Sequence, residues 1–265
     1  MTIDEIKKLA REKLGQNHGW RAAICGNLLA FLTAYAINST TQTICVVTGI
    51  IGMMQGAQMG SGDPEAVISA MSKNLLPLSV VVIVSYYVSA VFRYGISALS
   101  IAVVRGGARL GHAFSGFGKG WSTLWLMLLA HLYIFCWTLL FIIPGICAAF
   151  SYALIYLIKV DHPDWDSNRC IAESKRLMQG NRWRYFCLML SFIGWWLLAF
   201  IPFFVTLLDM HILMRAFCML HGLIAMGLVF VFVVPYINTA QDAFYENLLD
   251  QDTLNNQNNL NNLEP

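Results

Sequence analysis

The sequence predicts an all-α protein of the membrane: a polytopic bundle of about six transmembrane helices, with amphipathic interfacial helices on the cytoplasmic side. Three observations predict this fold class. Of the 265 residues, 57% are apolar and 12% are charged, whereas an average soluble domain carries about 25% charged residues. Several apolar segments are long enough to cross a bilayer. The positive charges gather on one side of those segments.

The first 15 residues predict an amphipathic surface helix. Thr2 and Glu5 have capping-box spacing, and Gly15 is placed to stop the helix. Basic residues occupy one face, and a helix of this kind can lie in the membrane surface. The apolar residues recur at helical spacing on the other face: Ile3, Ile6, Leu9, Ala10 and Leu14.

Six apolar segments are the candidate membrane spans. They cover residues 20–37, 75–104, 121–143, 146–160, 186–204 and 217–237. The stretch 44–54 is too short to span alone, so it either extends the first helix or re-enters the membrane. The second segment would be about 45 Å long as one helix, which exceeds the hydrocarbon thickness. It must therefore tilt, break near Gly95 or project beyond the bilayer. We expect a tight break over Ile143–Gly145, between the third and fourth segments.

We expect one integral-membrane domain over residues 1–250, followed by a disordered Asn-rich tail over residues 251–265. The domain divides into the surface helix 1–15 and three units, residues 20–105, 106–160 and 161–250. A surface segment and a glycine lead to a tryptophan in each unit: Gly15 to Trp20, Gly118 to Trp121, and Gly180 to Trp183. The pattern suggests three parallel helix-hairpin repeats. The alternative is that any basic loop entering a bilayer carries Trp, Lys and Arg.

The third unit opens with a basic amphipathic helix over Ser167–Gln179. Ser174 occupies a position on its apolar face, and Gly180 is placed to end it in a left-handed cap. The apolar face comprises Cys170, Ile171, Leu177 and Met178. A weaker surface helix is expected over Arg105–Gly120, where glycines are frequent.

Positive charges predict the orientation. With the N-terminus inside, the cytoplasmic segments hold 14 Lys and Arg residues, and the outer segments hold 2. This bias predicts that both the N- and C-termini are cytoplasmic.

Several motifs carry a family resemblance. They are Ile3–Gly15 leading to Trp20, Phe114–Phe117, Ile142–Ile146, Glu173–Trp195 and Val234–Ile237. On these motifs the chain resembles the uncharacterised bacterial integral-membrane family called domain of unknown function 975. The resemblance implies a multi-pass protein of the bacterial cytoplasmic membrane, and it transfers no catalytic residues.

Arg93 is the one basic residue well inside an apolar span. Its insertion costs about 2.5–3.5 kcal/mol, so it must snorkel or find a partner. The predicted spans contain no Asp or Glu, which leaves Asn27, backbone carbonyls or a lipid phosphate. Arg93 is therefore either a structural residue or a contact for an anionic ligand. His131 and His221 also lie in spans, where they could relay protons or simply be hydrogen-bonded packing residues.

The remaining polar candidates lie near the cytoplasmic side. The acidic loop of Asp161, His162, Asp164 and Asp166 has donors that suit a divalent cation. Acidic residues before a helix also stabilise its N-terminus, and we expect that role here. A polar cluster on the last helix is expected to mark its cytoplasmic end: Asn238, Gln241 and Asp242. The candidate contacts for anionic lipid are Lys175, Arg176, Arg182 and Arg184.

The sequence contains no zinc-protease, nucleophile-elbow or P-loop motif, so we expect no enzyme, cofactor or metal. A net charge of +2 does not suggest nucleic-acid binding. The leading interpretation is a non-enzymatic membrane scaffold or accessory protein. Its basic inner helices would bind anionic inner-leaflet lipid or a protein partner, and a homo-oligomer is compatible with this role. The alternative is a transporter or exporter of a small molecule or lipid, with a mid-membrane site near Arg93.

Overall fold

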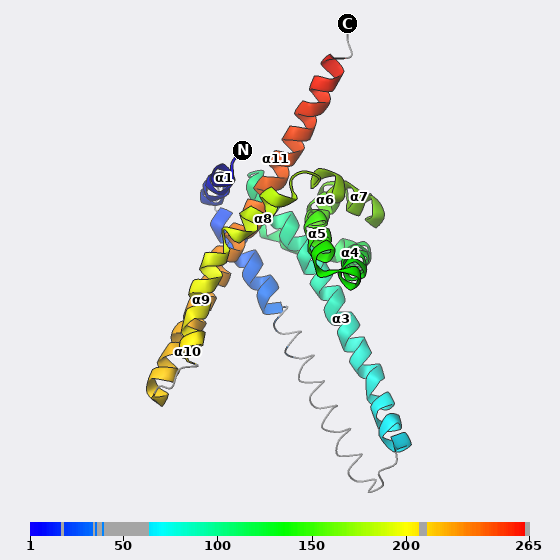
Figure 1. The fold of residues 1–265 in the computed structure, drawn as a ribbon, viewed down its shortest axis with the longest axis vertical. Helices are drawn as coiled ribbons and strands as arrows, with labels where there is room; N and C mark the ends of the chain where they lie inside the picture. The colour runs from blue at the N-terminus through cyan, green and yellow to red at the C-terminus, as the bar shows by residue number, and fades with distance from the viewer. Residues whose placement is uncertain (17–18, 34, 36–38, 40–63, 207–210, 263–265) are drawn as a thin grey trace.

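A computed structural model describes residues 1–16, 19–33, 35, 39, 64–206 and 211–262. All regular structure in these ranges is helical, which confirms the predicted all-α class. Two groups of apolar helices splay away from the end of the molecule that carries α1 and the C-terminal helix (Figure 1). Five described helical segments are long and apolar enough to cross a membrane, which suggests a membrane-embedded protein.

These five segments correspond to the second to sixth predicted spans, with changed boundaries. They are residues Val82–Val104 of α3 (Pro64–Val104), η1 (Leu110–Lys119) with α4 (Gly120–Leu140), α5 (Ile142–Ser151) with α6 (Ile155–Asp161), α8 (Arg182–Leu190) with α9 (Ile193–Val205), and α10 (Ile212–Leu228) with η2 (Val229–Val233) and α11 (Val234–Asn261) as far as Asn259. The first predicted span lies partly outside the described residues, and its described part, residues 19–33, is helical. The stretch 44–54 lies outside the described residues altogether.

The long helix α3 is not broken near Gly95. It runs unbroken for 41 residues, and Gly95 serves instead for close packing. A Cβ added at Gly95 would lie 1.9 Å from the carbonyl oxygen of Ala113, and one at Gly116 would lie 2.2 Å from that of Val91. The segment η1 (Leu110–Lys119) is therefore a 3-10 helix pressed backbone to backbone against the side of α3. We expected an amphipathic surface helix here, and glycine explains the difference because it lets two backbones approach.

The break between α4 and α5 lies slightly earlier than the expected Ile143–Gly145. Phe141 takes the extended conformation, and Pro144 falls within the first turn of α5. Proline is tolerated there because the first helical N–H groups have no intrahelical acceptor. Gly145 lets the two helices pack closely, since a Cβ there would lie 2.2 Å from Thr138 Oγ1.

The fourth predicted span is interrupted between α5 and α6, where the side chain of Ser174 hydrogen-bonds to the backbone. Its hydroxyl donates to the carbonyl oxygen of Ser151 (2.8 Å) and accepts from the N–H of Leu154 (3.3 Å). Ser174 is fully buried, so it satisfies two backbone groups that the helix break would otherwise leave unpaired. This explains why a polar residue occupies the apolar face of α7 (Ser167–Leu177).

The apolar faces of both N-terminal and central amphipathic helices pack on protein. On α1 (Ile3–Gly15), Ile6, Ala10 and Leu14 are at most 1% exposed. On α7, Cys170 is equally buried, and Gly180 beyond the helix has the expected positive φ of 81°. We expected these helices to bury their apolar faces in the membrane surface; they cover α11 and its neighbours instead.

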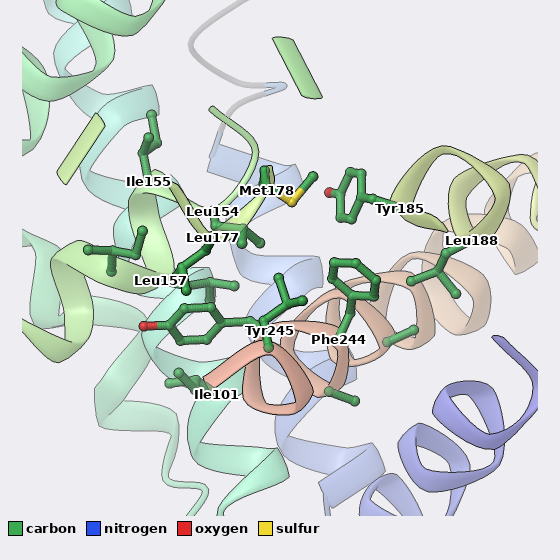
Figure 2. Close-up of a cluster of buried hydrophobic side chains, with 14 of the residues drawn as sticks. Ile101, Leu154, Ile155, Leu157, Leu177, Met178, Tyr185, Leu188, Phe244 and Tyr245 are labelled. Atoms are coloured by element: carbon green, nitrogen blue, oxygen red, sulfur yellow. The ribbon is translucent and has the colours of Figure 1, made fainter. Parts of the chain in front are cut away.

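A stretch of α11 is largely buried and forms the centre of the core. Six of its residues are at most 2% exposed: Thr239, Ala240, Asp242, Ala243, Phe244 and Tyr245. Phe244 and Tyr245 pack with apolar side chains of α3, α6, α7 and α8 (Figure 2). One continuous helical segment therefore contains both the sixth apolar segment and the buried centre of the core.

The C-terminal residues continue α11 as far as Asn261. We predicted a disordered tail from residue 251, because its Asn-rich sequence has no apolar period. An ion pair between Arg176 Nη1 and Asp252 Oδ1 (2.8 Å) ties the first turn of this extension to α7, which sequence spacing does not reveal. The internal repeat stays a prediction. Of its three glycines, Gly15, Gly118 and Gly180, only Gly180 has a positive φ.

Replacement of Gly95 by alanine should destabilise the protein by about 1–3 kcal/mol, because its Cβ would overlap a backbone oxygen that has no room to move. Gly118→Ala is the matched control, since a Cβ at Gly118 meets nothing within 4 Å. Unfolding by SDS titration in detergent micelles measures the difference. Equal midpoints for the two variants would contradict the close packing of η1 on α3.

Ser174→Ala should lower the free energy of unfolding by about 1–3 kcal/mol, because it leaves a buried N–H and a buried C=O without their partner. The control is Ser115→Ala, whose exposed hydroxyl bonds only its own turn. Hydrogen exchange at residues 151–155 should rise in the Ser174 variant alone. Unchanged protection there would show that the helix break does not depend on Ser174.

Candidate functional site

A cavity of about 600 Å³ lies between residues 19–33, α3, the α5–α6 junction, η2 and α11. We call it the Arg93 cavity. One part of its wall is apolar and includes Leu28, Phe31, Phe92, Ile96, Phe230 and Val231. Another part is polar and includes Asn27, Arg93, Ser100, Asn238, Gln241 and Asp242. This mixed lining suits a molecule that has both an apolar and a polar part.

Arg93 extends from α3 into this wall with an exposed side chain. It forms no ion pair with the described residues, and its charge acts at a distance on Tyr86 and Tyr156. Asn27, one of the partners that the sequence left open for Arg93, is engaged elsewhere. The Nδ2 group of Asn238 donates to Asn27 Oδ1 (2.8 Å), and Asn27 Nδ2 donates to the carbonyl of Ala23 (2.8 Å). Arg93 is therefore available to an anionic group.

Asp242 lies on the polar wall and is 2% exposed. Ser100 of α3 lies beside it, and the Ser100 hydroxyl donates to the carbonyl of Ser97 (3.3 Å). Its second carboxyl oxygen, Oδ2, is buried and has no donor in the part of the chain that the structure describes. A buried acceptor of this kind is costly to leave unpaired. The Arg93 cavity therefore contains both an uncompensated cation and an incompletely bonded carboxyl group.

An ion network beside the cavity holds α3, α6 and α11 together. Arg105 makes two bonds to Asp161, with Nη1–Oδ1 2.7 Å and Nη2–Oδ2 2.9 Å, and its Nε donates to Glu246 Oε1 (2.8 Å). These hydrogen bonds raise the pKa of the Arg105 guanidinium above its ordinary value, first through Asp161. Tyr245 also donates to Asp161 Oδ2 (3.0 Å). Asp161 is thus a structural ion-pair partner.

The acidic loop serves α7 as a cap. Asp166 Oδ1 accepts from the N–H of Asn168 (3.1 Å) at the start of the helix, which confirms the expected N-terminal role for this residue. His162 stacks on Trp165 with ring centroids 3.9 Å apart. Among the described residues, no group of three His, Cys, Asp or Glu side chains is placed to hold a metal ion.

The structure brings only one of the predicted site residues, Arg93, into the cavity. Arg176 is paired with Glu173 and Asp252, and its hydrogen bonds, first to Asp252 and then to Glu173, raise its pKa. Arg184 donates to the carbonyl of Met1 (2.7 Å) and to Asn181 Oδ1 (3.1 Å).

The other predicted contacts also lie away from the cavity. Lys175 is exposed, and Arg182 is half-buried with its Nε lacking an acceptor among the described residues. His131 is exposed outside the cavity, and its ring bonds the carbonyl of Met127 (2.8 Å).

The polar wall of α11 was not identified as part of a site. Asn238, Gln241 and Asp242 were expected to mark the end of the last helix, yet they line the same cavity as Arg93. Their spacing, i, i+3 and i+4, places them on one helix face. The sequence therefore indicated a shared polar face. This face packs on protein because α11 continues beyond the apolar segment into the core.

Comparison with known proteins covers part of the chain. No match was found among curated proteins or among solved structures. The model of an uncharacterised family, described as protein of unknown function (DUF975), matches residues 139–252. This range contains α5 to α9 and the polar wall of α11, whereas Arg93 lies before it. Over residues 139–252 the chain is therefore similar to the family that its motifs predicted, domain of unknown function 975.

Proposed function

We propose that this is a non-enzymatic membrane protein that binds an amphiphile with an anionic group in the Arg93 cavity and carries it as a transporter. The observation that supports this proposal most directly is Arg93 itself, a cation in a cavity wall without an ion-pair partner among the described residues. A guanidinium binds phosphate and carboxylate groups through two parallel hydrogen bonds. The proposed ligand therefore places its anionic group at Arg93.

The apolar wall supports an amphiphile rather than a small hydrophilic anion. Leu28 and Phe31 line the cavity and are 43% and 40% exposed, so the apolar part of the wall continues onto the outer surface. A lipid tail could extend from the apolar part of the cavity wall to the outer surface without contacting a charged group. A soluble phosphate ester would use only the polar wall, and the two sources can be separated by experiment.

The second candidate is a scaffold that binds anionic lipid at its basic helices. The exposed Lys175 and the 72% exposed Trp183 support this role. The burial of the apolar faces of α1 and α7 weighs against it, because those faces are occupied by protein. The Arg176 charge is also shared with two carboxylates. We therefore favour the Arg93 cavity as the functional site.

We further propose a location in the bacterial cytoplasmic membrane with both termini inside. The supporting observation is the asymmetry of Lys and Arg residues. Alkaline phosphatase fused after Thr206, between α9 and α10, should then be active outside the cytoplasm, and the same enzyme fused after Pro265 should be inactive. A fluorescent protein at each position should give the opposite pattern. Active phosphatase at the C-terminus would overturn this orientation.

Arg93→Gln should weaken binding of phosphatidylglycerol about tenfold, since a hydrogen bond to a charged group contributes about 1.5–3 kcal/mol. Native mass spectrometry of the full chain in detergent measures lipid retention. Arg215→Gln is the matched control, because Arg215 is exposed on α10 and does not line the cavity. Glycerol 3-phosphate tests the soluble alternative.

Equal retention by wild type, Arg93→Gln and Arg215→Gln would reject the Arg93 site. Competition by glycerol 3-phosphate at concentrations equal to the lipid would replace the amphiphile by a soluble ester. In proteoliposomes, fluorescent phosphatidylglycerol should exchange between leaflets with the wild type and not with Arg93→Gln. Binding without any exchange would leave a lipid-binding scaffold in place of a transporter.

A further inference from the structure

The unpaired oxygen of Asp242 bears on the identity of the ligand. The two polar-wall amides on its own helix donate to other acceptors. Asn238 Nδ2 donates to Asn27 Oδ1 (2.8 Å), and Gln241 Nε2 donates to Met189 Sδ (3.3 Å). Ser100 lies beside the carboxyl, and its hydroxyl donates to the carbonyl of Ser97 (3.3 Å), whereas Glu246 and Arg105 act on the carboxyl only through their charges. Within the described residues, Oδ2 is left without a donor.

Arg105 does not compensate Asp242 as an ion-pair partner. Its guanidinium bonds both oxygens of Asp161 and one oxygen of Glu246. Arg93 forms no ion pair with Asp242 either. Arg93 precedes Ser100, the neighbour of Asp242, by seven residues on α3, which is about 10 Å along the helix axis. The cavity therefore has a cationic contact point at Arg93 and a separate, unpaired carboxyl oxygen at Asp242.

A ligand that bridges these points needs an anionic group and, a short distance away, a hydrogen-bond donor. We infer that the ligand of the Arg93 cavity is an aminophosphate amphiphile of the phosphatidylethanolamine class, with its phosphate at Arg93 and its ammonium group at Asp242 Oδ2. This inference rests on the proposed function, because it uses the same cavity. The ammonium supplies the donor that Oδ2 lacks, and Arg93 supplies the guanidinium for the phosphate.

A metal ion explains the site less well. Hard cations such as calcium and magnesium require six or more oxygen ligands, from protein or water, and the described residues place no group of three His, Cys, Asp or Glu side chains to hold a metal ion. An ammonium group needs only acceptors at its N–H groups. The Asp242 carboxyl and the hydroxyl of Ser100 can provide them, since both residues line the cavity.

Three lipids separate the contributions of the two groups. Phosphatidylethanolamine carries a phosphate and an ammonium with N–H donors. Phosphatidylcholine carries a phosphate and a quaternary ammonium without N–H donors, and phosphatidylglycerol carries the phosphate and an uncharged glycerol without an ammonium. In native mass spectrometry, the wild type should retain phosphatidylethanolamine about tenfold more than phosphatidylcholine.

Asp242→Asn should reduce this ratio to about one and leave phosphatidylglycerol retention unchanged. Asp250→Asn is the matched control, because Asp250 is exposed on the same helix outside the cavity; it should keep the wild-type ratio. Asp242→Ser gives a second, smaller replacement with the same expected loss if the asparagine variant does not fold. Glycerophosphoethanolamine, which has the headgroup without acyl chains, should compete only weakly.

The inference is overturned if the ratio of the two zwitterionic lipids is the same in wild type and Asp242→Asn, or if Asp250→Asn changes it equally. Strong competition by glycerophosphoethanolamine would assign the site to a soluble ester and reject the lipid. Failure of the proposed function is distinguishable, because Arg93→Gln would then leave phosphatidylglycerol retention unchanged. A loss of phosphatidylglycerol in Arg93→Gln, with no effect of Asp242→Asn, would reject this inference alone.

Discussion

The enclosure of α11 between residues Thr239 and Leu248 is the constraint on which the rest of the structure depends. This segment follows directly from an apolar helix pair, α9 and α10, whose side chains are largely exposed. Because α1, α3 and α7 pack around it, one helix connects the apolar region to a protein core. The Arg93 cavity lies where these two environments meet, so its wall combines apolar side chains with the polar face of α11.

The amphipathic helices obtain their stability from this core. Burial of an apolar side chain contributes about 1.5–3 kcal/mol wherever the water is removed, so lipid and protein are equivalent destinations for the faces of α1 and α7. Periodicity alone cannot distinguish them. The break between α5 and α6 identifies protein as the partner of α7, because it leaves two backbone groups that the Ser174 hydroxyl bonds. A polar residue in an apolar stripe was thus a sign of protein contact.

Arg93 shows how far the reasoning from residue types extends. A lone cation in an apolar span requires a partner or an interface, and Arg93 does line the cavity. The predicted spans contain no carboxylate, because Asp242 follows the last of them by five residues. Asp161 shows the opposite case. Its loop has the composition of a cation site. Arg105, at the end of α3, lies next to it, and the Asp161 carboxylate forms an ion pair with this residue instead.

The sequence by itself determined the all-α class and the positions of the apolar helices, and it also indicated the left-handed cap at Gly180. Each of these depends on composition, on charge or on neighbours within a turn or two. Tertiary structure alone decided the rest: which surface buries each amphipathic face, how η1 packs on α3, that α11 continues to Asn261, and that Arg93 and Asp242 share one cavity. Those features join residues far apart in the chain, and only the folded geometry sets the distance between them.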